Sequence, residues 1–238
     1  MLDLGRIAFR ESWALQQRLF ELRGSGRLPD TLLLAEHPPT VTLGRSGRRE
    51  NLLLAADAYA GRGVELVEID RGGDVTYHGP GQLVGYPILD LSKRLPDVHK
   101  YVRALEEVML RVLAGFGIEG ARVAGMSGIW CGSEKVGAVG VKVKNWITMH
   151  GFALNVDPRP DGFELIVPCG IRGKGVTSLA RLLARPVDLD AVRQPTVDAF
   201  AAVFGATPVK ATWATELAGV TPWLQAASEP AGLLAEVC

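Results

Sequence analysis

The sequence predicts an α+β fold, in which helices pack on a mixed, mainly antiparallel sheet. Strand candidates fall into two clusters, three helix candidates stand apart from them, and the two kinds of segment do not alternate regularly. Regular alternation is typical of doubly wound parallel sheets, so its absence argues against that class. The chain has 238 residues and no internal repeat, a length compatible with one large domain or two small ones.

The first half of the chain predicts one helix and four strands. Leucines at steps of four and three residues predict a helix over 8–23, which ends at Gly24. Strands are expected at "TLLLAEHPP", "TVTLG", "VELVEID" and "QLVGYPILDL". Pro87 in the last strand predicts an edge position or a bulge, because proline has no N–H to donate to a sheet ladder.

The second half predicts three strands and three helices. Asp97 is a good N-cap for a helix whose apolar face reaches Phe116. Strands are expected at "SGIWCG", "KVGAVGVKV" and "ITMHGFALNV", and helices near 177–185 and 188–204. We expect residues 1–205 to form a single domain, with the tail 206–238 packed on the same domain.

The composition gives no sign of a nucleic-acid or membrane partner. Twenty-six basic residues balance 26 acidic ones, so the chain has no general attraction to nucleic acid or anionic lipid. No apolar run approaches 18 residues, and the N-terminus has no apolar core of signal-peptide length. Three widely spaced cysteines indicate neither a disulfide framework nor a metal site. We therefore expect a cytoplasmic protein with free thiols.

The segment "RGGDVTYHGPGQLVGYP" at 71–87 combines glycines with Arg71 and His78. Paired glycines at Gly72 and Gly73 let a ligand approach the main chain and use its N–H groups. His78 precedes a Gly-Pro-Gly turn and is suited to proton transfer near neutral pH, although a structural histidine bonded to the turn explains it as well. His150 has a weaker case, and we expect it in a pocket lining or in the core.

Cys169 is the best candidate for a nucleophile. It stands between Pro168 and Gly170, which excludes a regular ladder or helix interior, and a thiol at such a turn can face a cleft. The alternative is a small buried residue, since free cysteine is often buried. A thiol pKa of about 8.5 falls when a cation lies near. Cys131 reads as a structural strand residue and Cys238 as incidental.

Lys135 is the candidate cation. If the strand of "KVGAVGVKV" begins at residue 135, alternation places Lys135 on the face of Val139, Val141 and Val143, at the rim of the interior. The two later lysines then lie on the opposite face. The alternative is a strand that begins after Lys135, which leaves the ammonium in solvent.

Taken together, the motif at 71–87, "KVGAVGVKV", and "HGFALN" followed by "IVPCGI" resemble the lipoyl(octanoyl) transferases, in that family's order and at about its spacing. The resemblance covers roughly residues 30–180. It implies the α+β fold shared with biotin and lipoate protein ligases. It also implies that octanoyl moves from acyl carrier protein to a lysine on lipoyl domains, such as those of 2-oxoacid dehydrogenase E2 subunits, or on the glycine-cleavage H protein.

The resemblance implies that Cys169 carries the acyl group and that Lys135 activates it. From the chemistry we expect Lys135 to relay protons in both half-reactions, with His78 as the alternative. The donor is a thioester on the carrier's phosphopantetheine, so we expect no cofactor and no ATP. The residues implied to line the acyl site are Arg71, Gly72, Gly73, Asp74, Val75, Thr76, Tyr77, His78, Ala138, Val139, Gly140, Gly151, Phe152 and Ala153. Leu83 and Val84 are expected to wall the acyl slot.

Three other functions are compatible with parts of the pattern. An ATP-dependent lipoate or biotin protein ligase has the same fold, although no "GxxxxGK[ST]" phosphate loop occurs in this chain. A cysteine hydrolase would use Cys169 and His78, and a silent acyl-binding module would use neither. The loop "GRSGRRE" at 44–50 is either a basic docking patch for acidic partners or a solvated charged loop.

Overall fold

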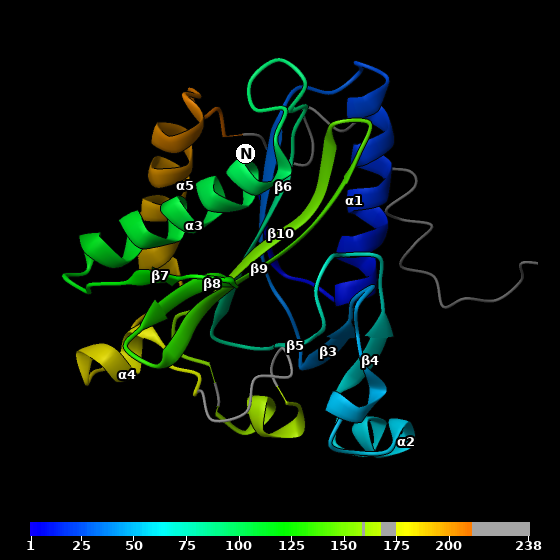
Figure 1. Cartoon of the computed structure of the whole chain (residues 1–238), viewed down its shortest axis with the longest axis vertical. Coiled ribbons are helices and arrows are strands. Elements are labelled where there is room, and N and C mark those ends of the chain that lie inside the picture. The colour runs from blue at the N-terminus through cyan, green and yellow to red at the C-terminus, as the bar shows by residue number, and fades with distance from the viewer. Residues whose placement is uncertain (159, 168–174, 211–238) are drawn as a thin grey trace, which may run out of the picture.

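The computed structural model describes residues 1–158, 160–167 and 175–210 (Figure 1). Within these residues the strands form two sheets. The larger, seven-stranded sheet has the order β1 (Leu2–Arg6), β2 (Thr31–Glu36), β6 (Gln82–Ile88), β10 (Ile147–Asn155), β9 (Glu134–Lys144), β8 (Met126–Cys131) and β7 (Ala121–Val123). The smaller, three-stranded sheet has the order β4 (Glu65–Glu68), β3 (Thr40–Leu43) and β5 (Val75–His78).

Both sheets are mixed, and most strand pairs are antiparallel. The pair β1–β2 is parallel in the larger sheet and the pair β3–β4 is parallel in the smaller one. The helical segments are α1 (Phe9–Gly24), η1 (Arg49–Asn51), α2 (Ala56–Ala60), α3 (Val98–Gly115), η2 (Pro160–Leu165), α4 (Leu179–Leu183) and α5 (Asp190–Phe204). The α+β class predicted from the sequence is confirmed.

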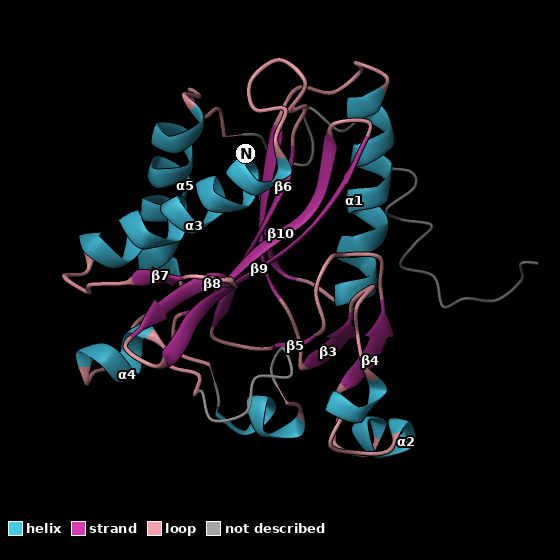
Figure 2. Ribbon diagram, in the orientation of Figure 1, coloured by secondary structure: helices cyan, strands magenta, loops and turns pink. Residues whose placement is uncertain are grey.

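Helices cover the two faces of the larger sheet unequally (Figure 2). On one face α3 and α5 enclose the largest apolar cluster, which includes Leu34, Leu83 and Phe152 from the sheet. On the other face α1 packs on β6 and β10 through Leu15 and Leu19. Because α1 covers only part of this face, the remainder lies against the three-stranded sheet (Figure 1).

The long helix α3 begins where the sequence predicts. The Asp97 carboxylate accepts hydrogen bonds from the backbone N–H groups of His99 (2.9 Å) and Lys100 (3.1 Å), which would otherwise lack partners in the first helical turn. Of the predicted apolar face the middle is buried, at Leu105, Val108, Met109 and Val112, whereas its first residue, Val98, is exposed. The strands β1, β5 and β7 and the short helix α2 were not predicted, and neither was the division of the strands into two sheets.

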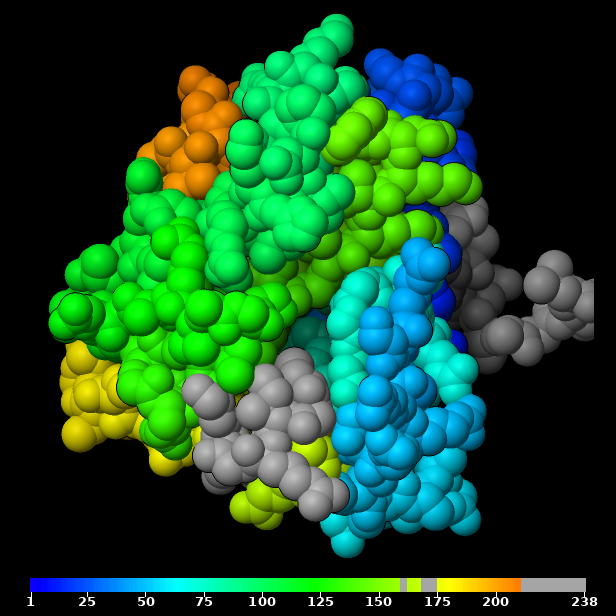
Figure 3. Space-filling model, viewed as in Figure 1, coloured from blue at the N-terminus to red at the C-terminus, as the bar shows by residue number. Residues whose placement is uncertain are grey.

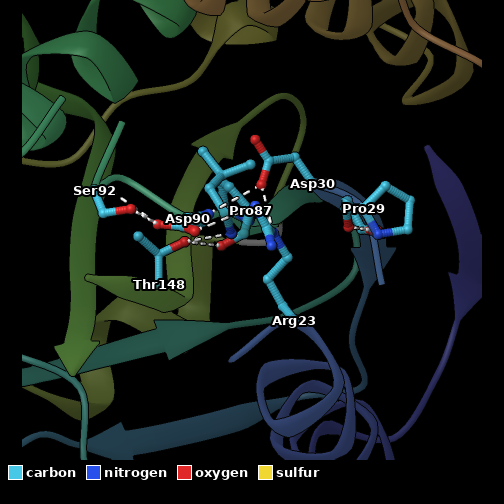
Figure 4. A network of polar contacts seen from close by, with 9 residues as sticks. Arg23, Pro29, Asp30, Pro87, Asp90, Ser92 and Thr148 are labelled. Carbon is cyan, nitrogen blue, oxygen red and sulfur yellow. Dashed lines mark hydrogen bonds and ion pairs between the residues drawn. The ribbon is translucent and has the colours of Figure 1, made fainter. Parts of the chain in front are cut away.

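Pro87 does not lie in an edge strand, because β6 pairs with β2 on one side and β10 on the other. The ladder with β10 stops at Gly85↔Phe152 and resumes beyond the proline at the isolated bridge Asp90↔Ile147. In the gap the Thr148 hydroxyl donates to the Pro87 carbonyl (2.7 Å) and accepts from the backbone N–H of residue 89 (2.9 Å; Figure 4). A side chain therefore replaces the missing ladder bonds.

The same region is tied to the end of α1. Arg23 pairs with Asp30 (2.8 Å) and Asp90 (3.5 Å), and the Asp90 carboxylate accepts from the Ser92 hydroxyl (2.6 Å; Figure 4). These contacts fix the loops at one end of the sheet, on the side away from the three-stranded sheet. None of the helices in the described part of the chain is long and apolar enough to cross a membrane.

Candidate active site

A narrow cavity of about 70 Å³ lies between the two sheets and the first turn of α1. The surface is hollowed between the green region of β8 and β9 and the cyan region of the three-stranded sheet, which both contribute to its walls (Figure 3). The lining residues are Phe9, Ile69, Arg71, Gly73, Asp74, Val75, Thr76, His78, Val84, Tyr86, Ser127, Lys135, Ala138, Val139, Gly140, His150, Gly151, Phe152 and Ala153.

The structure brings most of the sequence-predicted residues to this cavity. Three of those that the structure describes are not among its lining residues. Gly72 instead donates its backbone N–H to the Val141 carbonyl (2.9 Å), which joins the glycine-rich segment to β9. Tyr77 packs with Phe163 in the separate apolar cluster of the three-stranded sheet. Leu83, expected to wall the slot, lies in the α3-side core, whereas Val84 does line the cavity.

Sequence reasoning missed four lining residues: Phe9, Ile69, Tyr86 and Ser127. Phe9 opens α1, Tyr86 lies in β6 and Ser127 lies in β8, so they reach the cavity only through the topology. The glycine-rich segment continues into β6, where successive side chains point to opposite faces of the sheet. This alternation is the one sequence signal that points to Tyr86.

Lys135 lines the cavity and is buried, with 8% of its surface exposed, but it does not share the face of the valines. The register of β8 and β9 shifts between Ile129↔Gly137 and Trp130↔Lys135, so Val136 is an extra residue. This bulge places Val136 in the α3-side core and turns Lys135 to the cavity side, where its Nζ lies 4.8 Å from the Trp130 ring centroid. The predicted alternation was wrong because it assumed an uninterrupted strand.

Cys169 lies outside the described residues, as does Cys238. The chain on either side of the gap at 168–174 is anchored to the cavity walls. Before it, the N–H of Val167 donates to the Asn51 carbonyl (2.9 Å), and the Asn51 amide donates to Asp74 (2.5 Å). After it, the N–H of Lys135 donates to the Gly175 carbonyl (2.9 Å).

The third cysteine, Cys131, is half-buried and has no disulfide partner among the described residues. Burial, with a smaller contribution from the Glu134 charge, raises the pKa of its thiol. The thiol therefore stays protonated at neutral pH, as suits the structural role expected for it.

His78 is held in one tautomer by a chain of amides. Gln82 donates through Nε2 to Asn155 Oδ1 (2.9 Å), so its Oε1 faces His78 Nδ1 (2.7 Å) and must accept the proton from it. Asn155 in turn donates to the Thr177 carbonyl (3.0 Å). Burial, with the His37 charge as a smaller cause, lowers the pKa of His78 to about 3. The ring is therefore neutral, with the lone pair on Nε2.

Arg71 lines the cavity and ties the glycine-rich segment to β3. Its guanidinium donates to the Thr42 carbonyl (2.9 Å) and hydroxyl, to the Gly72 carbonyl (3.0 Å) and to the Asp74 carbonyl (2.8 Å). The side chain is buried and packs close to Gly140 of β9, where an added Cβ would lie 3.0 Å from Arg71 Cδ. Arg71 thus shapes the cavity wall.

A second polar group lies away from Lys135. Asp70 accepts from His150 Nε2 (2.8 Å) and also pairs with Lys142. The hydrogen bond from His150, followed by the contact with Lys142, holds the pKa of Asp70 well below its usual range. Burial lowers the pKa of His150, and the Asp70 carboxylate opposes this shift. His150 lines the cavity, in agreement with one of its two expected positions.

The basic loop is partly neutralised within this chain. Arg48 pairs with Glu50 (3.4 Å) and Arg49 with Glu68 (2.5 Å), and all four side chains are exposed. Arg45 is exposed, and its N–H donates to the Arg71 carbonyl, so the loop borders the cavity.

The cavity combines apolar walls with one buried lysine side chain. Val84, Phe152 and Ala153 give it a lining suited to a hydrocarbon chain, and Lys135 supplies a cation. Histidine, cysteine and carboxylate side chains of the described residues form no group of three that could hold a metal ion. The arrangement suits group transfer to or from a chain with an apolar tail and a reactive end near Lys135.

Residues 8–201 match the family described as Lipoyl protein ligase A/B catalytic domain. An octanoyltransferase of Chloroflexus aggregans is 51% identical over 211 residues, which are 87% of this chain and 96% of that protein. An octanoyltransferase of Caldicellulosiruptor saccharolyticus is 46% identical over 205 residues, or 85% of this chain and 87% of that protein. A solved lipoate-protein ligase A bound with ATP matches at TM-score 0.74 and 16% identity, over 94% of this chain and 93% of that one, and supports the fold.

Proposed function

Because the chain belongs to the lipoyl protein ligase A/B catalytic domain family, and within it to the octanoyltransferases, we propose that it transfers octanoyl from acyl carrier protein to a lipoyl-domain lysine. The acceptors are lipoyl domains such as those of 2-oxoacid dehydrogenase E2 subunits, and the glycine-cleavage H protein. The observation that carries this proposal is a buried lysine in an apolar cavity beside the anchored ends of the Cys169 segment.

Cys169 is the proposed nucleophile. It follows Val167 by two residues, so chain connectivity keeps their Cα atoms within about 7 Å of each other. Val167 is bonded to Asn51, which is bonded to Asp74 in the cavity wall. The thiolate sulfur attacks the octanoyl carbonyl of the donor, the carbon–sulfur bond to the carrier breaks, and the carrier leaves as a thiol after taking a proton. The product is an octanoyl-cysteine thioester.

In the second step the acceptor lysine attacks the same carbonyl. A free lysine is mostly charged at neutral pH, so its amine must lose a proton before it attacks and another as the amide forms. The Cys169 thiolate leaves, and the amide product makes the step favourable. Lys135 is the proposed proton relay in both steps, and its place in the cavity supports this role. The unprotonated Nε2 of His78 is the alternative acceptor.

Because the donor is already a thioester, the reaction needs no nucleotide. The test is to mix the purified protein with octanoyl-acyl carrier protein and a lipoyl domain without ATP, and to measure the mass of the lipoyl domain by intact mass spectrometry. We expect one octanoyl group on the lipoyl domain. A ligase instead requires free octanoate and ATP, a hydrolase releases octanoate, and a binding module leaves the donor intact. Any of these three results would overturn the proposal.

A further inference from the structure

His150 is turned out of its regular place in β10. It pairs with Val141 of β9, whose side chain belongs to the α3-side core, so strand alternation would direct His150 to that side. Instead its backbone adopts a left-handed conformation with φ +59°. This conformation is unfavourable for a residue with a Cβ and, within a strand, redirects the side chain. The ring therefore points to the cavity and α1.

The turned ring is fixed from three directions. Its Nε2 donates to Asp70 (2.8 Å), and Asp70 is held in turn by Lys142. The backbone N–H of His150 donates to Gln16 of α1 (3.0 Å), and the Trp13 ring centroid lies 6.5 Å from the imidazole. Only 2% of the surface of His150 is exposed. Contacts from several elements therefore hold His150 in a backbone conformation that is otherwise unfavourable.

His150 lies at the opposite end of the cavity from Lys135. Its partner Val141 is six positions beyond Lys135 in β9, which corresponds to about 20 Å along a strand. Beyond His150 the sheet face is covered by α1, where Leu15 and Leu19 pack against Met149 (Figure 1). The bulge at Val136 shortens this path, and the side chains of Lys135 and His150 both line the cavity and take up part of it, so the open length is less than this. An extended eight-carbon chain measures about 10 Å, and the thioester that anchors it near Lys135 adds to that length.

We propose that His150 is the end wall of the acyl cavity and sets the longest acyl chain that the enzyme accepts. This inference rests on the proposed acyl transfer. A longer chain would have to displace the imidazole from Asp70, which would leave the buried ring of His150 without that partner. Asp70, Lys142 and Gln16 act as positioning residues for this wall, since each acts through His150.

The test compares wild type with His150→Gly, because glycine adopts the left-handed backbone without strain and removes the ring. Each protein is mixed with a lipoyl domain and equimolar hexanoyl-, octanoyl-, decanoyl- and dodecanoyl-acyl carrier protein. The masses of the acylated lipoyl domain are then measured by intact mass spectrometry. We expect the ratio of the two longer products to octanoyl to rise about tenfold or more, since each methylene admitted to an apolar pocket changes selectivity by such factors. An unchanged ratio in an active, folded variant overturns the inference.

Ala184→Gly is the matched control, because Ala184 also has a positive φ of 51° but lies at the end of α4, away from the cavity. Its product ratio should equal that of wild type. If wild type transfers no acyl group of any length, the proposed function itself fails, whereas transfer with an unchanged ratio in His150→Gly refutes only the end wall.

A second measurement needs no variant. The wild-type enzyme is acylated from an acyl carrier protein whose eight-carbon acyl chain ends in a photoreactive diazirine. The enzyme is then irradiated and digested. Adducts on the peptides that contain His150, Trp13 or Gln16 support the end wall. Adducts confined to residues 127–138 place the chain end near Lys135 and overturn it.

Discussion

At the scale of single residues, three histidines are buried in a neutral state in or near the cavity. Burial lowers the pKa of His37 to about 4, against a smaller opposing effect of its bond to the Ile7 carbonyl. His37 accepts from the Tyr86 hydroxyl (2.6 Å), and its ring centroid lies 6.0 Å from that of His78. The pKa values of His78 and His150 are lowered by burial as well. The three rings therefore add no positive charge to that of Arg71, which lines the same cavity.

These shifts make stability depend on pH in a definite direction. The unfolded chain binds protons at its histidines near pH 6.5, but the folded chain binds them at His37 and His78 only near pH 4 and 3. The contribution to stability is complete above about pH 6.5 and is lost as the pH falls toward those folded values. We expect urea unfolding to show a loss of about 2 kcal/mol for each of the two histidines between pH 7.5 and 5.

The control for this prediction is the exposed His99. In His78→Gln the loss of unfolding free energy between pH 7.5 and 5 should be smaller than in wild type, whereas His99→Gln should leave the pH dependence as it is. Equal unfolding free energies at the two pH values in wild type would show that the folded protein accepts these protons without cost.

At the scale of elements, the cavity floor depends on close approach between β6 and β10. A Cβ added at Gly151 would lie 2.1 Å from the Gly85 carbonyl oxygen and 2.6 Å from Pro87 Cδ. Both are backbone or ring atoms that cannot rotate away, so the strands would have to separate. Gly151→Ala should therefore lower the free energy of unfolding by about 3 kcal/mol, measured by urea unfolding at pH 7.5.

Gly115→Ala is the matched substitution. Gly115 ends α3, and nothing lies within 4 Å of its added Cβ. Alanine favours the helix, so stability should stay the same or rise by up to about 1 kcal/mol. If Gly151→Ala were as stable as Gly115→Ala, the strands would not be in the tight contact described here.

The elements that could be predicted from the sequence carry their own local signals. The helix α3 has a capping aspartate and a continuous apolar face, and β2, β9 and β10 are rich in branched apolar residues. The strand β5 lies inside the glycine-rich segment, where no period is visible, and β7 has only three residues. The bulge at Val136 and the turned backbone of His150 arise from pairing with other strands, which a single segment does not encode.

Much of the candidate site could be named in advance because the resemblance covers contiguous motifs. The face of Lys135 could not be predicted, since it depends on the bulge. Phe9 and Ser127 come from separate elements, and only the topology shows that they meet the glycine-rich segment at one cavity. Sequence patterns thus identified the chemical groups better than their orientation.

At the scale of the whole molecule, the site depends on how the two sheets meet. The chain before residue 168 is bonded to Asn51, beside the three-stranded sheet, and the chain after residue 174 is bonded to Lys135 in the larger sheet. The Gly72 N–H donates to the Val141 carbonyl and so bonds the glycine-rich segment, which leads into the three-stranded sheet, to β9 of the larger sheet. The described residues on the two sides of 168–174 are therefore bonded to different sheets, one beside the three-stranded sheet and one in the larger sheet.

Intact mass spectrometry of the enzyme itself tests the proposed octanoyl-cysteine intermediate most directly. After mixing with octanoyl-carrier alone, wild type should gain one octanoyl group and lose it when a lipoyl domain is added. Cys169→Ser should gain none, and Lys135→Ala should gain it more slowly. An octanoyl adduct that persists in Cys169→Ser, or transfer to the lipoyl domain by Cys169→Ser at the wild-type rate, would contradict the account.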